Sequence, residues 1–180
     1  ASSVAALMGR GVRPVMITGD AEASALSVAA RVGIPASDVR SSLRPEDKLR
    51  IVQEFQKKGL RVGMTGDGIN DAAALKATDV GFALAEGTDL SMEAGDVVIT
   101  RGGLSRLVEA LDLSALMVRK IKSNLAWAFV YNLLAIPAAG LALVHPLIAE
   151  TAMTLSSVGV VLNSLAIRGT YERKIRRRRK

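Results

Sequence analysis

An uncharged stretch of twenty residues near the C-terminus constrains the fold of this chain more than any other feature. From Leu125 to Val144 the sequence contains no Asp, Glu, Lys or Arg, and a helix of twenty residues is long enough to cross about 30 Å of hydrocarbon. A second apolar stretch, Leu147 to Ile167, contains Glu150 as its one charged residue. Because two residues separate the stretches, they predict a transmembrane helical hairpin. The alternative is a pair of core helices in a soluble protein.

The charges that flank the hairpin predict its orientation. Residues 168–180 carry 8 basic residues and 1 acidic residue, whereas residues 1–123 are nearly balanced, with 16 basic and 15 acidic ones. Arg119, Lys120 and Lys122 directly precede the first stretch. Basic flanks favour the cytoplasmic side, so the N-terminal part and the tail are expected in the cytoplasm, with the tail at anionic lipid. A DNA-binding domain would spread basic residues over a folded face, so no nucleic-acid partner is expected.

Composition excludes several other classes of protein. A hydrophobic fraction of 49% with 23% charged residues excludes a disordered chain. The sequence has no Cys, which excludes a disulfide scaffold, a zinc finger and a thiol nucleophile within these residues. No signal pattern opens the sequence, and Ala1 is not a natural first residue, so we expect the chain to be part of a longer protein.

Residues 1–103 are expected to form an α/β domain, followed by a linker helix and the hairpin over residues 104–167 and a basic tail over residues 168–180. Short apolar runs alternate with segments of helical periodicity. Strands are predicted at 14–18, near 39, and at 61–65, 80–84 and 97–99, with helices over 21–31, from 45 and from 104. This alternation predicts a parallel sheet with helices on both faces. In such a sheet the functional site lies at the carboxyl ends of the strands.

Two predicted strands end in similar polar motifs, TGD at 18–20 and TGDGIND at 65–71. Glycines in these motifs let the backbone approach a ligand closely. Asp67 and Asp71 place two carboxylates near the start of a helix, and hard oxygen ligands of this kind suit Mg²⁺, which retains waters and a phosphate oxygen. Lys48, in the PEDK motif at a helix start, would supply a fixed positive charge for a phosphoryl group.

The motifs TGD, PEDK and GDGIND, in this order and spacing, resemble the second half of the phosphorylation domain of P-type ATPases, which has the haloacid dehalogenase fold. The resemblance covers essentially the whole chain, because the family also continues into two transmembrane helices. It implies ATP-driven ion transport through an aspartyl-phosphate, with Mg²⁺ and ATP. The family's nucleophile lies in a DKTGT motif, which does not occur here. The chain alone is therefore expected not to turn over ATP.

The resemblance also implies roles for individual residues. Those that it places in the catalytic machinery are Thr18, Gly19, Asp20, Lys48 and Asn70. Thr18 would bind the transferred phosphoryl group, the Asp of TGD would lie beside the nucleotide, and Lys48 would neutralise the phosphoaspartate. Asp67 would bind Mg²⁺, with Asn70 and Asp71 completing the site. The implied partners are the actuator, nucleotide-binding and transmembrane segments upstream in the same parent chain.

In having two helices after the phosphorylation domain, the chain is similar to the heavy-metal branch of the family. The sequences of both helices look like the copper(I) signature of that branch. This signature covers Tyr131 and Asn132 in the first helix and Met153, Ser156 and Ser157 in the second. The last three share one helix face, and a thioether suits a soft ion such as Cu(I). The alternative is that these polar residues only pack and hydrogen-bond the two helices.

Three functions remain open. The preferred one is a copper(I) exporter, for which silver would be an equivalent cargo. A zinc or cadmium exporter would need an ionisable residue in its last helix, and Glu150 is the one candidate. A catalytically inactive, membrane-anchored regulator is the third, against which the complete set of phosphate and magnesium residues argues. The expected location is the cell membrane, with the lipid bilayer and a soluble copper chaperone as further partners.

Overall fold

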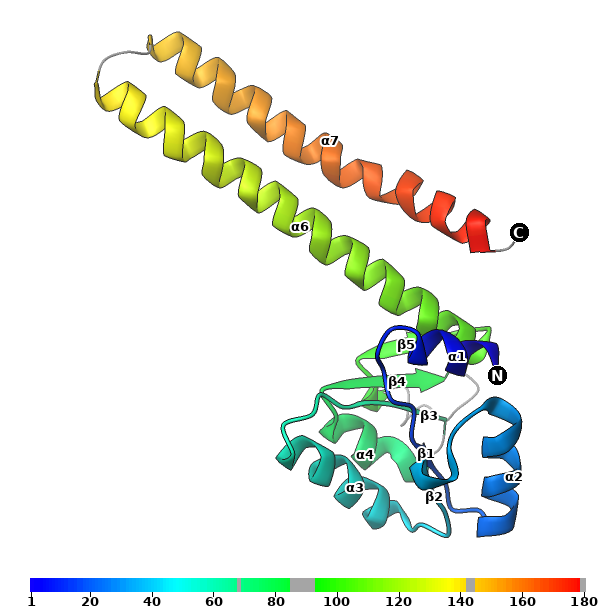
Figure 1. Cartoon of the computed structure of the whole chain (residues 1–180). Coiled ribbons are helices and arrows are strands. Elements are labelled where there is room, and N and C mark those ends of the chain that lie inside the picture. Colours follow the sequence, from blue (N-terminus) through cyan, green and yellow to red (C-terminus); the bar gives the residue numbers. More distant parts are fainter. Residues whose placement is uncertain (68, 85–92, 142–144, 179–180) are drawn as a thin grey trace. The chain divides into compact units, whose positions relative to one another are not determined.

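The structure, a computed structural model, describes residues 1–67, 69–84, 93–141 and 145–178 (Figure 1). The chain forms two compact units, residues 1–109 and residues 110–180. The described elements that precede the two long helices are α1 (Ser2–Met8), β1 (Met16–Ile17), α2 (Glu22–Val32), the 3₁₀ turn η1 (Ala36–Asp38), β2 (Val39–Arg40), α3 (Pro45–Lys57), β3 (Gly63–Gly66), the 3₁₀ turn η2 (Ile69–Asp71), α4 (Ala72–Ala77), β4 (Val80–Leu84) and β5 (Val97–Ile99). The long helices are α6 (Gly103–Gly140) and α7 (Pro146–Arg178).

Local sequence signals explain where the helices of the first unit begin and end. Pro45 opens α3, where its missing N–H is not needed. The carboxylate of Asp47 accepts a hydrogen bond of 3.0 Å from the backbone N–H of Arg44, which caps the same helix. Helix α2 ends at Gly33, whose φ of 83° is a conformation that glycine adopts without strain. The predicted starts of α3 and of α6 differ from the observed ones by at most one residue.

All described strand pairs are parallel, which confirms the predicted parallel α/β fold. Strands β4 and β5 cover the predicted ranges, whereas β1 is restricted to two residues, because its pairing is confined to Met16 opposite Val39 and Ile17 opposite Arg40. The described strands form two sheets, β1–β2 and β3–β4–β5. Parallel pairing of β3 with β4 brings their carboxyl ends to one edge of the second sheet, and the sequence motif TGDGIND begins at that edge.

The core of the first unit lies between α3, α4 and β3. Val52, Met64, Ala74 and Leu75 are buried in it, and Leu75 is fully inaccessible. Helix α4 packs on β3 and β4, and α3 packs on α4. Figure 1 shows α3 and α4 on one side of β3–β4–β5, and α1 with the first turns of α6 on the other. These layers hold α3 and the end of β3 in a fixed arrangement.

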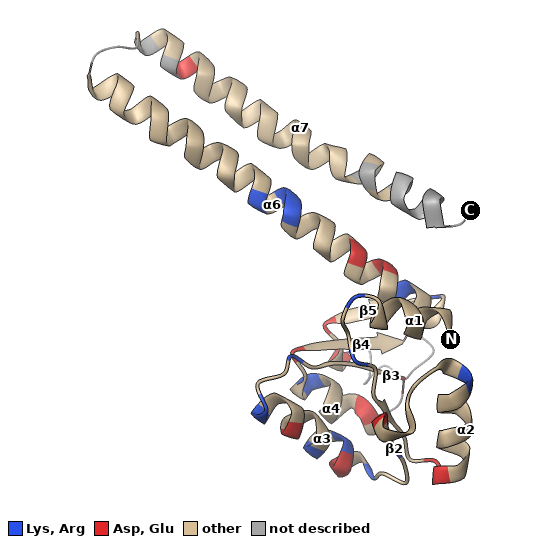
Figure 2. Ribbon diagram, viewed as in Figure 1, with Lys and Arg blue, Asp and Glu red and all other residues tan. Residues whose placement is uncertain are grey.

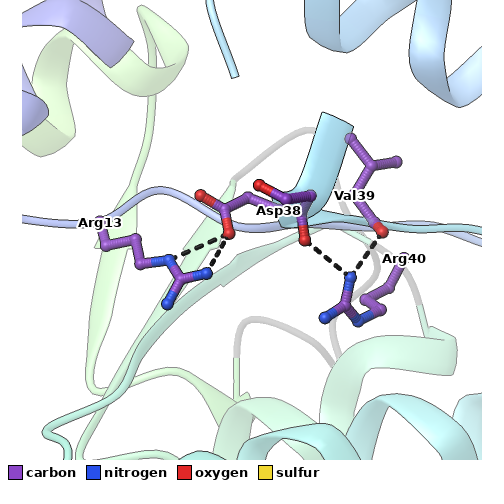
Figure 3. A network of polar contacts seen from close by, with 5 residues as sticks. Arg13, Asp38, Val39 and Arg40 are labelled. Carbon is purple, nitrogen blue, oxygen red and sulfur yellow. Dashed lines mark hydrogen bonds and ion pairs between the residues drawn. The ribbon is translucent and has the colours of Figure 1, made fainter. Parts of the chain in front are cut away.

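An ion pair ties the segment before β1 to the turn before β2 (Figure 3). Both Nε and Nη2 of Arg13 donate to Oδ1 of Asp38, with a distance of 3.0 Å for Nε. Asp38 is buried, yet its hydrogen bond with Arg13 lowers the pKa of the carboxyl below its ordinary value, against the opposing effect of burial. Arg40 Nη1 donates to the carbonyls of Ser37 and Val39, at 2.9 Å each. These contacts stabilise the pairing of β1 with β2.

The second unit consists of α6 from residue 110 onward and of the whole of α7. Helix α6 continues without a break for 38 residues, as expected for a linker helix that runs into the first apolar stretch. Within α7, residues Glu150–Ile167 are long and apolar enough to cross a membrane, with a mean hydropathy of 1.3. The other predicted span, 125–144, ends in residues 142–144, which lie outside the described residues. In Figure 2 the ribbon of residues 1–122 carries many charged residues, whereas the described apolar stretches are almost without them.

Replacement of Asp38 by Asn should lower the free energy of unfolding at neutral pH, and it should make that free energy depend less on pH in the acidic range. The folded pKa of Asp38 is below the ordinary value of 3.8, so its ionised form stabilises the fold above that pH, and the contribution is lost as pH falls through the lowered pKa. Thermal unfolding, followed by circular dichroism from pH 7 to pH 3, measures the effect. Glu54→Gln, at an exposed position on α3, is the control. An Asp38→Asn curve parallel to that of the unchanged chain would contradict the assignment.

Candidate functional site

The turn that follows β1 is closed by its own side chains. Thr18 Oγ1 donates to Oδ2 of Asp20 at 2.9 Å, and it accepts from the backbone N–H of Asp20 at 3.1 Å. The backbone N–H of Thr18 donates to the carbonyl of Arg40 at 2.9 Å, which continues the pairing with β2. A Cβ on Gly19 would lie 3.3 Å from the carbonyl oxygen of Leu43. Glycine therefore allows the segment after β2 to approach this turn closely.

The same turn is bound to the segment that leads into α3. The backbone N–H of Leu43 donates to the carbonyl of Thr18 at 3.1 Å, and that of Ser42 donates to the carbonyl of Asp20 at 2.8 Å. Lys48 follows on the first turns of α3. These bonds connect the TGD turn, through five residues of chain, to the lysine of the PEDK motif.

Lys48 in turn forms an ion pair with Asp71, the residue that opens α4. Lys48 Nζ lies 2.6 Å from Asp71 Oδ1, and the two side chains are 14% and 11% exposed. Because removing a charge from water is costly unless an opposite charge compensates it, loss of either partner would leave a buried, unpaired charge at a cost of about 3–5 kcal/mol. The pair therefore joins α3 to the GDGIND segment and fixes the position of the lysine ammonium group.

The carboxylate of Asp71 lies directly against Gly66, the last residue of β3. A Cβ placed on Gly66 would be 2.8 Å from both the Cβ and Oδ2 of Asp71, distances that real side chains do not tolerate. The glycine at this position is therefore required by the ion pair itself. The TGD turn, Lys48 and the end of β3 form one connected set of contacts.

Asp67 and Asn70 lie at the exposed surface beside this pair, and residue 68 between them lies outside the described residues. Among the residues that the structure describes, no cluster of three or more His, Cys, Asp or Glu side chains is arranged to hold a metal. Exposed carboxylate and amide oxygens fit an ion that takes few protein ligands and completes its shell with water and phosphate oxygens, as Mg²⁺ does. One oxygen of Asp71, Oδ1, accepts a hydrogen bond from Lys48 in this structure.

The five residues predicted to hold copper divide into two groups in the hairpin. Tyr131 and Ser156 are partly buried, whereas Asn132, Met153 and Ser157 are exposed. The Ser157 hydroxyl donates to the carbonyl of Met153, at 3.0 Å. The two helices of this chain thus cover part of the predicted set, and the thioether of Met153, whose residue is 57% exposed, lies on the outer surface of the hairpin.

Polar residues outside the predicted copper set form a contact between the two long helices that the sequence motifs did not single out. Asn124 Nδ2 donates to Ser164 Oγ at 2.8 Å, and Lys120 Nζ donates to Asn163 Oδ1 at 2.6 Å. A signal for it exists in the sequence, since Asn163 and Ser164 interrupt an apolar stretch, where polar groups are expensive unless they face a partner.

Comparison with known proteins matches both parts of the chain. The family model of haloacid dehalogenase-like hydrolases matches residues 1–79. The chain is 45% identical over 168 residues to a copper-exporting P-type ATPase of Mycobacterium leprae, and 44% identical over 161 residues to an Enterococcus hirae protein named "Probable copper-importing P-type ATPase A". These matches cover 93% and 89% of the chain. The chain spans about a fifth of the length of these relatives, 21% and 22%.

Solved structures of related proteins share the fold. A zinc-transporting PIB-type ATPase in its E2.Pi state matches 93% of the chain with a TM-score of 0.85 and 30% identity, and the match covers 27% of that protein. The catalytic domain of the CPx-ATPase CopB-B matches 57% of the chain with a TM-score of 0.54 and 33% identity, and the match covers 40% of that domain. The similarity therefore extends beyond residues 1–79.

Two glycines of β3 provide a matched test of the site. Gly66→Ala should destabilise the chain by about 1–3 kcal/mol, because the new methyl group would displace the Asp71 carboxylate from Lys48. Gly63→Ala should cost less, since its Cβ would meet Phe82 at an ordinary distance of 3.6 Å. Urea denaturation of both variants measures the difference. Equal losses of stability would show that the close approach of Asp71 to Gly66 is unimportant.

Proposed function

Because the chain belongs to the P-type ATPase family, we propose that it is the part of an ATP-driven heavy-metal pump that binds the transferred phosphoryl group and continues into the last two membrane helices. The observation that carries this proposal is the largely buried ion pair of Lys48 and Asp71 at the end of β3. It holds one ammonium group at the strand edge, where the TGD turn is attached through Leu43. A fixed cation is what a phosphoryl group needs there, since such transfers depend on positioning and on neutralisation of charge.

The residues divide the work of phosphoryl transfer among themselves. In the proposed reaction, the γ-phosphoryl group of ATP passes to an aspartate carboxylate of the parent chain, outside these 180 residues, and ADP leaves. The Thr18 hydroxyl and the backbone of Gly19 bind phosphoryl oxygens, Asp20 lies towards the nucleotide, and Lys48 neutralises the acyl phosphate. The hydrogen bonds that close the turn hold Thr18 in place before the substrate binds, so that less ordering is needed in the transition state.

Asp67 is the proposed main ligand of Mg²⁺, with Asn70 and Asp71 beside it. When bound, Mg²⁺ would supply charge neutralisation for the phosphate oxygens. One oxygen of Asp71 also has a second task, since it orients the ammonium group of Lys48. A complete set of such residues would serve no purpose in an inactive, membrane-anchored regulator, which is therefore the weaker alternative.

Copper(I) is the proposed cargo, with silver as an equivalent one. The thioether of Met153 is a soft ligand, and it lies one helical turn from Ser156 and Ser157 on α7. Relatives named for copper are 44–45% identical to the chain, whereas the zinc-transporting structure is 30% identical. A zinc or cadmium pump stays the second candidate. Glu150 lies in the first turns of α7, close to the His145–Pro146 break, and fits a central divalent site poorly.

The proposed location is a cell membrane, with residues 1–123 and the basic tail in the cytoplasm. The exposed large apolar side chains of α6 and α7, among them Trp127, Leu133 and Leu165, suit contact with lipid and with other membrane helices of the parent protein. The upstream actuator and nucleotide-binding domains are the proposed partners in the reaction cycle. A soluble copper chaperone is a further proposed partner.

Asp67→Asn in the parent protein should abolish Mg²⁺-dependent phosphorylation by radiolabelled ATP, because the amide replaces an anionic ligand by a neutral one. Acid-stable labelling of the protein measures the phosphoenzyme. Glu54→Gln, at an exposed position on α3, should retain normal labelling. Undiminished labelling of Asp67→Asn would defeat the magnesium assignment, and absence of labelling from the unchanged parent protein would favour the regulator.

Met153→Ala in the parent protein should weaken copper(I) binding by at least about tenfold, because even indirect supports of a metal site contribute that much. Copper(I) titration in the presence of a competing chelator measures the affinity. Met117→Ala, at an exposed methionine of α6 that precedes the apolar stretch, controls for nonspecific binding by thioethers. Equal affinity in the Met153→Ala variant would show that this face of α7 only packs against other helices.

A further inference from the structure

A continuous chain of hydrogen bonds joins α6 to α7. Lys120 Nζ donates to Asn163 Oδ1 at 2.6 Å, and Asn163 Nδ2 donates to Asn124 Oδ1 at 2.6 Å. Asn124 Nδ2 then donates to Ser164 Oγ at 2.8 Å, and the Ser164 hydroxyl donates to the carbonyl of Val160 at 2.8 Å. All four polar side chains are partly buried. We call this set, Lys120, Asn124, Asn163 and Ser164, the interhelical polar cluster.

The lysine determines the direction of every bond in the cluster. An ammonium group can only donate, so the amide oxygen of Asn163 must accept and its nitrogen must donate onward. The same reasoning then orients Asn124, and the serine hydroxyl passes its proton to a backbone carbonyl. The cluster thus has one satisfied arrangement. A sliding movement of one helix along the other would leave several partly buried polar groups without partners, which is costly in an apolar surrounding.

The position of the cluster relates it to the proposed copper residues. Tyr131 is seven residues after Asn124, and Ser156 is seven residues before Asn163. Seven residues are about two helical turns, or 10.5 Å, so each residue of a pair lies on the same face of its helix. The helices run antiparallel, and Asn124 bonds Asn163. The register that the cluster sets therefore places Tyr131 and Ser156 at one level, each on the partly buried side of its helix.

Between the interhelical polar cluster and the turn that joins the helices, the described part of the helix interface has little power to specify register. Apart from Tyr131 and Ser156, its partly buried positions there are Ala128, Ala135 and Ala138 on α6 and Ala152 and Val160 on α7. Small apolar side chains let helices approach closely, but they form no directional bonds. A slip of one turn, about 5.4 Å, would bring Tyr131 to the level of Ala152 or Val160 instead of Ser156.

We propose that the interhelical polar cluster is a register clamp, which positions Tyr131 opposite Ser156 in the membrane. Its four residues are positioning residues, and they do not touch the transported ion. The clamp itself rests on the hydrogen bonds above, whereas its consequence for ion binding rests on the proposed function.

Disulfide formation between introduced cysteines measures the register directly, because the 180-residue chain contains no Cys. The chain is placed in phosphatidylcholine vesicles and oxidised with diamide, which avoids a metal catalyst. The in-register pair is Ala135→Cys with Ala152→Cys. The out-of-register pair, Ala138→Cys with Ala152→Cys, is about 4.5 Å further along α6. Since a disulfide tolerates only Cα separations of about 4.4–6.8 Å, the first pair should form at least about fivefold faster.

Asn124→Leu combined with Asn163→Leu should bring this rate ratio close to one. In case the double variant inserts poorly, Lys120→Met removes only the cation that orients the cluster, and it should lower the same ratio. Lys122→Met, which changes an exposed lysine of the same helix turn, should leave the ratio unchanged. A ratio that stays at its original value in both cluster variants would overturn the clamp.

The consequence for ion binding is tested in the parent protein. Asn163→Leu should raise the copper(I) concentration for half-maximal ATPase activity by at least about threefold, while phosphorylation by ATP is retained. Asn163→Gln, which keeps the amide group, should restore part of the affinity for copper(I). The positioning role would be overturned if Asn163→Leu keeps the copper dependence of the unchanged protein while Met153→Ala weakens copper(I) binding as predicted. If both variants keep the copper dependence of the unchanged protein, the copper proposal fails. The cross-linking rates then decide by themselves whether the clamp exists.

Discussion

The ion pair between Lys48 and Asp71 is the interaction on which the rest of the first unit depends. Both side chains are largely buried, so neither charge is tolerated without the other. The pair connects the start of α3 to the start of α4, and the Asp71 carboxylate lies directly against Gly66 at the end of β3. Because α3 and α4 also enclose the core around Leu75, the position of the lysine ammonium group is coupled to the packing of the whole unit.

The proposed phosphoryl site would work by holding charge in place, and several contacts around it keep its charged groups in position. The TGD turn is closed by Thr18 and Asp20 and attached to the segment before α3. The pair of Arg13 and Asp38 secures the strand that carries that turn. Rigid attachment means that little reorganisation accompanies the arrival of a charged substrate, and preorganised charges of this kind commonly provide a large share of catalysis.

The hairpin uses the same physical principle in an apolar surrounding. Polar side chains there must find partners, and in α6 and α7 those of Asn124 and Asn163 find each other across the helix interface. The hydrogen-bonded cluster shares one helix interface with two of the proposed copper residues, Tyr131 and Ser156, which lie two turns away. Exposure of Met153 and Asn132 on the outer surface leaves these side chains available to the other membrane helices of the proposed parent pump.

The sequence by itself determined most of the elements and predicted a chemistry for the motifs. Apolar runs predicted β4 and β5, Pro45 predicted the start of α3, and the glycines of TGD and GDGIND indicated backbone close to a ligand, because these signals act over a few neighbouring residues. Only the tertiary structure decided which charges meet: Lys48 pairs with a carboxylate 23 residues away, Arg13 with one 25 residues away, and Asn163 with an amide 39 residues away. Such contacts depend on how helices pack on strands and on each other, and periodicity along the chain carries no information about that packing.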